Sequence, residues 1–136
     1  MFTLDNFSSV FVPELMANHN WQSQYRLIIQ WGKLIQHKPE LRTPKFLVKG
    51  CEVSAWLAHK EEHGIHYFAF DSDSRVINGL AVLLLVQVHG KTALELFKVD
   101  FEQQLLSVGL QKHLTPSRSN GLHALVQKFK QFMAVG

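Results

Sequence analysis

The chain has 136 residues, 46% of them hydrophobic, and a formal net charge of +3 at pH 7 with histidine neutral. Its length is typical of one domain, which we expect to span residues 1–136, and its apolar content excludes a disordered chain. The 14 basic and 11 acidic residues are interspersed, so we expect no nucleic-acid partner. The single cysteine, Cys51, excludes an internal disulfide, a CxxC redox pair and a thiolate-rich zinc site.

Two features of the sequence bear on its location. The first residues, Met1 to Asn6, lack a basic segment followed by an apolar stretch, so they do not resemble a secretory signal. The longest apolar segment, residues 76–88, is interrupted by Asn78 and Gln87 and is shorter than the ~20 residues that a membrane-spanning helix needs. We therefore expect a soluble, cytoplasmic protein with no membrane partner.

The segment before the cysteine is predicted to be mainly helical. A short helix is expected to begin at Pro13. Asn20 is a good N-cap for a longer amphipathic helix. The connection 37–44 contains two prolines and mixed charge, so it is predicted to be exposed and non-helical. The apolar stripe of the longer helix consists of Trp21, Tyr25, Ile28, Gly32 and Ile35.

An antiparallel hairpin is predicted directly after the cysteine. Residues 53–58 alternate between two faces, as the residues of a strand do, and residues 65–70 alternate again. The polar stretch 61–64 between them supplies the reversal of the chain.

Three further helices are predicted in the second half. The helix Arg75–His89 is apolar almost all the way round and ends before Gly90, so we expect it to be the buried centre. A short helix opens at Asp100 and closes at Gly109, and a final amphipathic helix begins at Thr115-Pro116. Runs of helix around one small antiparallel sheet favour the α+β class, with helices packed on one face of the sheet.

The residues around Cys51 leave two interpretations open. Free cysteines are often small, buried, apolar fillers. In contrast, Gly50 gives the backbone unusual freedom, and the charges of Lys49 and Glu52 disfavour deep burial of this segment. Such a position at a loop tip suits a cysteine with a chemical role.

Other clusters of functional side chains have simpler explanations. His59, His63 and His66 lie around the predicted turn with side chains on alternating faces, which favours a solvated turn over a metal site. Asp71 and Asp73 precede a helix, which favours helix capping over acid and base catalysis.

Arg118 is the remaining candidate outside the cysteine segment. A cation in the first turn of a helix faces the positive end of the helix dipole, where it is unfavourable unless it has a partner. We therefore expect Arg118 to face an anionic group or a partner protein.

The chain contains, in this order, the segments NWQSQYRLIIQWGKLI, VKGCEVSAWL, FDSDSRVINGLAVLLL and LTPSRSNGL. Together they resemble the SufE family, whose members are sulfur acceptor proteins that work with cysteine desulfurases. The resemblance runs from about Asn20 to the final helix. Two branches stay open, because residues 89–92 resemble the CsdE branch while residues 114–119 are more similar to SufE itself.

This resemblance implies a SufE/NifU-like α+β fold and a partner, a SufS- or CsdA-like cysteine desulfurase. The partner carries the pyridoxal phosphate, so we expect no cofactor and no metal in this chain. Cys51 falls on the family's sulfur-acceptor position, and Arg118 falls on a family arginine that lies near the acceptor loop. The implied activity is acceptance of persulfide sulfur for iron-sulfur cluster assembly or related sulfur transfer.

Sulfur transfer requires a thiolate to attack the outer sulfur of a persulfide. Lys49 and Arg118 are the cations available to favour that thiolate, whereas Glu52 would oppose them. We expect Gly50 to let the loop swing outward, and Trp56 or nearby apolar side chains to shield the resting thiol.

The main hypothesis is a sulfur carrier and desulfurase activator rather than an independent enzyme. The alternative is a regulatory module that binds a desulfurase or another partner without carrying sulfur. Replacement of Cys51 separates the two, since only the carrier needs the thiol.

Overall fold

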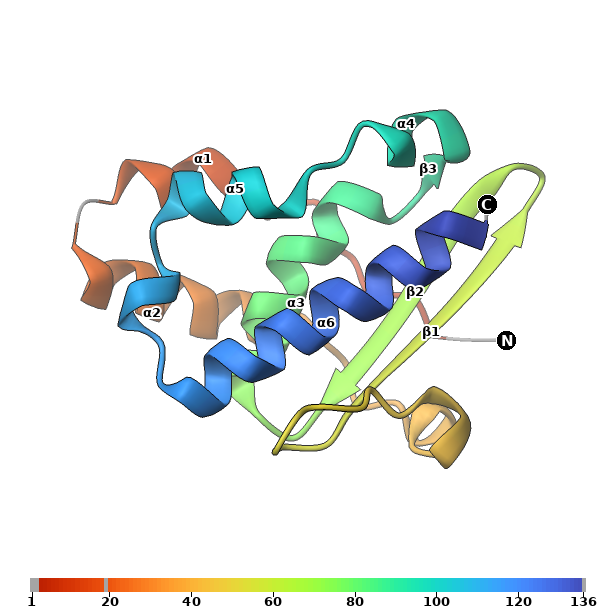
Figure 1. Ribbon diagram of the computed structural model, residues 1–136, viewed down its shortest axis with the longest axis horizontal. Helices are drawn as coiled ribbons and strands as arrows, with labels where there is room; N and C mark the ends of the chain where they lie inside the picture. The colour runs from red at the N-terminus through yellow and green to blue at the C-terminus, as the bar shows by residue number, and fades with distance from the viewer. Residues whose placement is uncertain (1–2, 19, 136) are drawn as a thin grey trace.

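A small antiparallel sheet and a set of helices make up the protein (Figure 1). The computed structural model describes residues 3–18 and 20–135. The sheet has the strand order β1-β2-β3, with both neighbouring pairs antiparallel, so the predicted α+β class is confirmed. The elements are α1 (Val12–Ala17), α2 (Trp21–Gly32), β1 (Ala55–Glu62), β2 (Ile65–Ser72), α3 (Arg75–Val88), β3 (Lys91–Thr92), α4 (Ala93–Phe97), α5 (Phe101–Val108) and α6 (Pro116–Val135), with 3-10 turns at Pro39–Leu41, Pro44–Phe46 and Gln111–His113.

Helices begin at side-chain caps, close to where the sequence predicts them. Asn20 accepts hydrogen bonds from two backbone N–H groups in the first turn of α2, while Ser74 caps α3 and Asp100 caps α5. These bonds satisfy amides that have no partner within the helix. Gly109 ends α5 in a left-handed conformation with φ of 71°, as a C-terminal glycine does.

The backbones of α2 and α3 approach each other closely at two glycines. A Cβ atom on Gly79 would lie 1.9 Å from the carbonyl oxygen of Ile28, and one on Gly32 would lie 2.4 Å from that of Arg75. Both positions therefore require glycine. Nearly every residue of α3 is buried, which confirms its prediction as the centre of the core. No helix in residues 3–18 and 20–135 is both long and apolar enough to cross a membrane.

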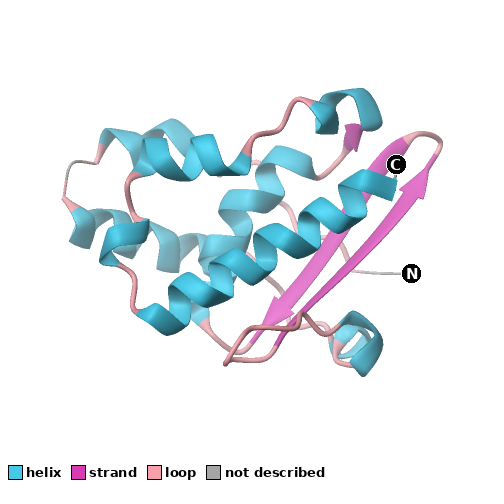
Figure 2. Cartoon of the chain, in the orientation of Figure 1, coloured by secondary structure: helices cyan, strands magenta, loops and turns pink. Residues whose placement is uncertain are grey.

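The β1–β2 hairpin packs one face against the helices (Figure 2). Leu57, Phe68 and Phe70 on this face are buried. The ring of Phe68 lies 5.4 Å from that of Phe129 in α6, so α6 covers the sheet beside α3. Residues 55–58 and 65–70 confirm the predicted alternation, although both strands run two to four residues further than predicted.

The opposite face of the hairpin is covered by the connection between α2 and β1. Leu41, Ala58 and Ala69 form a second buried cluster, against which Phe46 and Trp56 pack. The prediction of an exposed, non-helical connection over residues 37–44 is therefore wrong. Its prolines begin two 3-10 turns, and tertiary contacts bury parts of it.

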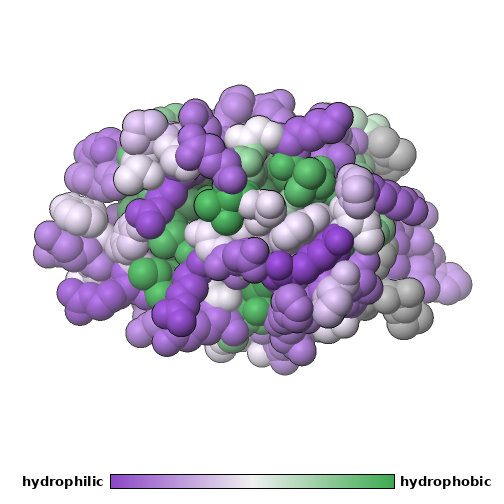
Figure 3. Space-filling view, turned by 90° about the horizontal axis from the view of Figure 1, so that it is seen from below, coloured by the Kyte–Doolittle hydropathy of each residue, from purple (hydrophilic) through white to green (hydrophobic). Residues whose placement is uncertain are grey.

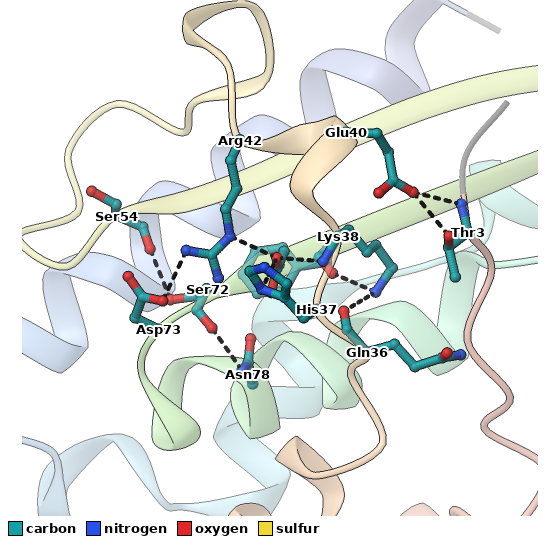
Figure 4. A network of polar contacts seen from close by, with 12 residues as sticks. Thr3, Gln36, His37, Lys38, Glu40, Arg42, Ser54, Ser72, Asp73 and Asn78 are labelled. Carbon is teal, nitrogen blue, oxygen red and sulfur yellow. Dashed lines mark hydrogen bonds and ion pairs between the residues drawn. The ribbon is translucent and has the colours of Figure 1, made fainter.

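A buried polar network ties this connection to the sheet and to the N-terminal segment (Figure 4). Lys38 is fully buried, and its Nζ lies 2.5 Å from the Asp5 carboxylate and donates to the carbonyl of Phe70. The Asp71 carboxylate accepts from the backbone N–H of Lys38 at 2.8 Å and from Nε of Arg42 at 2.9 Å. Each charge is thus paired and hydrogen-bonded, as burial requires.

Strand β3 and helix α4 are absent from the sequence prediction. β3 has only two residues, which is too short for an alternation to be seen. Thr92 and Glu95 form a capping box at the start of α4, and this Thr-x-x-Glu spacing was a usable signal.

Replacing Asp5 with asparagine tests whether the buried pair stabilises the fold. The substitution leaves the Lys38 ammonium without a carboxylate in the interior, so the free energy of unfolding should fall by about 3 kcal/mol or more. Urea denaturation followed by circular dichroism measures this change. Glu40→Gln is the control, because Glu40 also binds the N-terminal segment, through Thr3, but is fully exposed. An equal loss in both variants would contradict a special role of the buried pair.

Candidate functional site

The cysteine lies in a short loop that is anchored at both ends to the start of β1. We call residues 47–54 the Cys51 loop. Leu47 forms an isolated β-bridge with Trp56, and the backbone N–H of Val48 donates to the carbonyl of Ala55 at 2.8 Å. The loop lies beside the end of β2 and the start of α3, at the lower edge of the molecule in Figure 1.

Gly50 determines the path of this loop. Its φ of +97° lies in a region that residues with a side chain rarely adopt. A Cβ atom there would also lie 3.3 Å from Cβ of Ala124 in α6. The loop therefore bends directly against α6, and the bend places Cys51 next to the first turns of that helix.

Cys51 is half-buried against α6. Its thiol lies 3.7 Å from the carbonyl oxygen of Gly121, at the distance of a weak S–H donor contact. A Cβ atom on Gly121 would lie 3.8 Å from Sγ and 3.1 Å from Cδ1 of Ile77. The absence of a side chain on Gly121 therefore leaves room for the sulfur and for Ile77.

The thiol borders a cavity of about 280 Å³ at the start of α6. Ile77 supplies an apolar part of its wall, and the loop residues Glu52 and Val53 form another side. The lining residues are Cys51, Glu52, Val53, Ser74, Ile77, Thr115, Ser117, Arg118 and Gly121.

Burial raises the pKa of the Cys51 thiol. Desolvation is the cause, and neither Lys49 nor Arg118 offsets it. The expectation that these two cations favour the thiolate is therefore wrong for this arrangement of the loop. The resting thiol is mainly protonated near neutral pH, which makes it a weak nucleophile.

Arg118 lines the same cavity as Cys51 but interacts with a different group. Its guanidinium carbon lies 5.4 Å from the centre of the Tyr25 ring, in a cation–π contact between α6 and α2. Its backbone N–H donates to the hydroxyl of Thr115 at 3.3 Å. The structure thus brings together the two residues singled out in the sequence, with the arginine held on an aromatic ring.

The shielding of the thiol comes from residues other than Trp56. Cys51 packs against the main core, whereas Trp56 belongs to the cluster on the opposite face of the sheet. There the Trp56 ring lies 4.6 Å from the guanidinium of Arg42. Of the two shields that the sequence suggested, the nearby apolar side chains are therefore the ones in contact.

The histidines differ from their predicted arrangement. His59 and His66 lie on the same face of the hairpin with ring nitrogens 2.8 Å apart, and the His59 ring stacks on Phe132 of α6. Their prediction as solvated turn residues is wrong, and of the three only His63 lies in the turn. No group of three or more metal-binding side chains occurs in the part of the chain that the structure describes.

The two aspartates also have structural contacts, although they do not cap the helix as predicted. Asp71 is buried in β2 and binds Arg42, and Asp73 binds the same guanidinium at 2.8 Å. Ser74 provides the cap of α3.

Sequence reasoning did not single out Tyr25, Ile77 and Gly121 as parts of this site. Tyr25 and Ile77 were recognised only as apolar positions of helices, and Gly121 as one letter of the final quoted segment. Their roles depend on packing between α2, α3 and α6, which no local pattern reveals.

A three-stranded α+β domain with one half-buried cysteine on a loop beside a helix start defines the class of protein. The family model described as "SufE: Fe-S metabolism associated domain" matches residues 10–133. The chain therefore belongs to the SufE family, as the sequence resemblance indicated, and has a role in iron-sulfur related sulfur metabolism.

One solved structure shares the fold. It is the solution structure of a hypothetical protein from Thermus thermophilus, which is 14% identical in sequence with a TM-score of 0.72. The match covers 97% of this chain and 96% of that one. At this level of identity the similarity concerns the fold alone.

The raised pKa predicts how Cys51 reacts with iodoacetamide. In the folded chain the alkylation rate should rise with pH around a midpoint above that of the same chain unfolded in urea, because burial delays formation of the thiolate. Rates measured by mass spectrometry from pH 6 to pH 10 give both midpoints. A midpoint in the folded chain at or below the unfolded one would contradict the buried position of the thiol.

Proposed function

We propose that this protein accepts a sulfur atom from a cysteine desulfurase on Cys51 and carries it to a later recipient. The observation that carries this proposal is the position of the single thiol in a glycine-containing loop beside Arg118. Membership of the SufE family supports it, because that family is associated with iron-sulfur metabolism.

The transfer step is an exchange at sulfur. The Cys51 thiolate attacks the outer sulfur of a persulfide on the donor cysteine, and the sulfur–sulfur bond of the donor breaks. The donor cysteine leaves as a thiolate, and the outer sulfur is now bonded to Cys51. The proton of Cys51 goes to solvent or to the departing thiolate, so the step needs no oxidant or reductant.

The resting burial of the thiol fits a carrier that reacts only with its partner. A thiol with a raised pKa is a poor nucleophile towards adventitious reagents. Docking of the donor would move the Cys51 loop away from Gly121, which ends the desolvation and restores an ordinary pKa. Gly50 provides the backbone freedom for this movement.

Arg118 supplies the positive charge that the resting thiol lacks. Its guanidinium already lines the cavity, and the contact with Tyr25 leaves its donors available for an anionic group. A bound persulfide is more acidic than a thiol and therefore anionic near neutral pH, so Arg118 would hold it after transfer.

A single cysteine suits storage of the sulfur. A second thiol nearby would attack the persulfide, release sulfide and leave a disulfide. Because Cys51 has no such neighbour in the sequence, the bound sulfur can wait for the recipient. The pyridoxal phosphate chemistry that produces the sulfur would belong to the donor.

Intact-protein mass spectrometry tests the proposal. The chain is incubated with the cysteine desulfurase of its source organism, pyridoxal phosphate and free cysteine. We expect a gain of one sulfur that dithiothreitol removes and that Cys51→Ser abolishes completely, since serine cannot form a persulfide. No gain on the unsubstituted chain would contradict the carrier function.

The same variant separates the carrier from a regulatory module. A carrier with Cys51→Ser should no longer stimulate sulfide release by the desulfurase in the presence of a reductant. Undiminished stimulation would instead support a module that regulates the desulfurase without carrying sulfur.

A further inference from the structure

A basic groove runs from the Cys51 loop along α6. It has a volume of about 810 Å³, and it lies between residues 44–50 on one side and one face of α6 on the other. Its lining residues are Pro44, Lys45, Leu47, Val48, Lys49, Gly50, Asn120, His123, Ala124, Gln127, Lys128 and Gln131. We call it the Lys45 groove.

The charge of this groove has one sign. Three lysines, Lys45, Lys49 and Lys128, line it together with His123, and no carboxylate does so among the residues described. Acidic and basic residues are interspersed over the rest of the sequence, so a groove with cations alone is a local feature. Its potential is therefore positive, and a concave shape strengthens that potential.

The lysines of the groove have no acidic partners within residues 3–18 and 20–135. The ammonium group of Lys45 lies 5.3 Å from the centre of the Phe46 ring, and that of Lys128 lies 5.1 Å from the centre of the Phe132 ring. Lys49 is exposed on the loop itself. In contrast, Lys38, Lys60 and Lys130 each form a salt bridge to a carboxylate. The groove thus keeps its charge available for another molecule.

The face of α6 that borders the groove is polar and regular. Asn120, Ala124, Gln127 and Gln131 recur at intervals of three or four residues, so they share one side of the helix. Glutamine and asparagine side chains there can both donate and accept hydrogen bonds. Figure 3 views the molecule from the side of the Cys51 loop, where hydrophilic residues surround smaller hydrophobic areas.

The groove is continuous with the site of sulfur transfer. Val48, Lys49 and Gly50 belong both to its lining and to the Cys51 loop. Gly50 approaches Ala124 at the point where the groove meets the loop. A partner that fills the groove therefore contacts the segment whose movement would release the thiol.

We infer that the Lys45 groove binds an acidic surface segment of the sulfur donor, an inference that rests on the proposed function. Carboxylates of the donor would pair with Lys45, Lys49 and Lys128, which orients the donor cysteine towards Cys51. Such pairing at an exposed surface accelerates association and fixes the orientation of two proteins.

Neutralising the groove tests this inference. The variant Lys45→Gln, Lys49→Gln, Lys128→Gln is compared with Lys33→Gln, Lys98→Gln, Lys112→Gln, which removes three exposed lysines outside the groove and thus the same total charge. Both sets are made in the Cys51→Ser background, so that binding is measured without sulfur transfer. The probe is the purified cysteine desulfurase of the source organism, and surface plasmon resonance gives Kd at low and high salt.

We expect the groove variant to bind the desulfurase about tenfold more weakly than its parent at low salt and to lose most of the salt dependence. The control variant should change Kd less than about threefold. An equal loss in both variants, or none in the groove variant, would overturn the inference. Binding of a mixed-sequence oligonucleotide in place of the desulfurase would overturn it as well.

Cross-linking with a carbodiimide provides a second measurement. This reagent joins lysines to carboxylates in direct contact, so Lys45, Lys49 or Lys128 should be joined to aspartate or glutamate of the desulfurase. Cross-links from Lys33, Lys98 or Lys112 alone would place the donor elsewhere and contradict the inference.

The outcomes also separate this inference from the proposed function. If Cys51 accepts sulfur while the groove variant binds the desulfurase normally, the groove assignment fails and the carrier function stands. If the unsubstituted chain neither binds the desulfurase nor gains sulfur, both fail together.

Discussion

The contact between the Cys51 thiol and the carbonyl of Gly121 is the constraint on which the rest of the site depends. It exists because two glycines allow it: Gly50 bends the loop towards α6, and Gly121 leaves space for the sulfur. The same contact removes the thiol from water and raises its pKa. Reactivity is therefore governed by the position of the loop, since burial alone sets the direction of the pKa shift in this arrangement.

The fold supplies rigid surroundings for that one adjustable segment. Close packing of α2 on α3 at Gly32 and Gly79 fixes the helix that carries Ile77, and the same α2 carries Tyr25, on which Arg118 rests. The hairpin anchors both ends of the Cys51 loop. A short loop between fixed ends can move without disturbing the core, because its own contacts with α6 are few and weak.

The sequence predicted local features well and tertiary ones poorly, for physical reasons. Helix starts at Asn20 and Ser74 depend on side chains within a few residues, so they could be recognised. Burial of Lys38 depends on Asp5 and on a strand more than thirty residues away, and no periodicity encodes that. Cys51 and Arg118 were singled out correctly as neighbours, but the raised pKa follows from burial and could not be foreseen.

The most direct test of the account is a crystal structure of this chain bound to the desulfurase. We predict that Cys51 Sγ leaves the carbonyl of Gly121 and faces the donor cysteine, while the hairpin and α6 keep their positions. The account would be contradicted if Sγ stays within 3.7 Å of that carbonyl, as it does in the free chain, while the donor cysteine lies elsewhere.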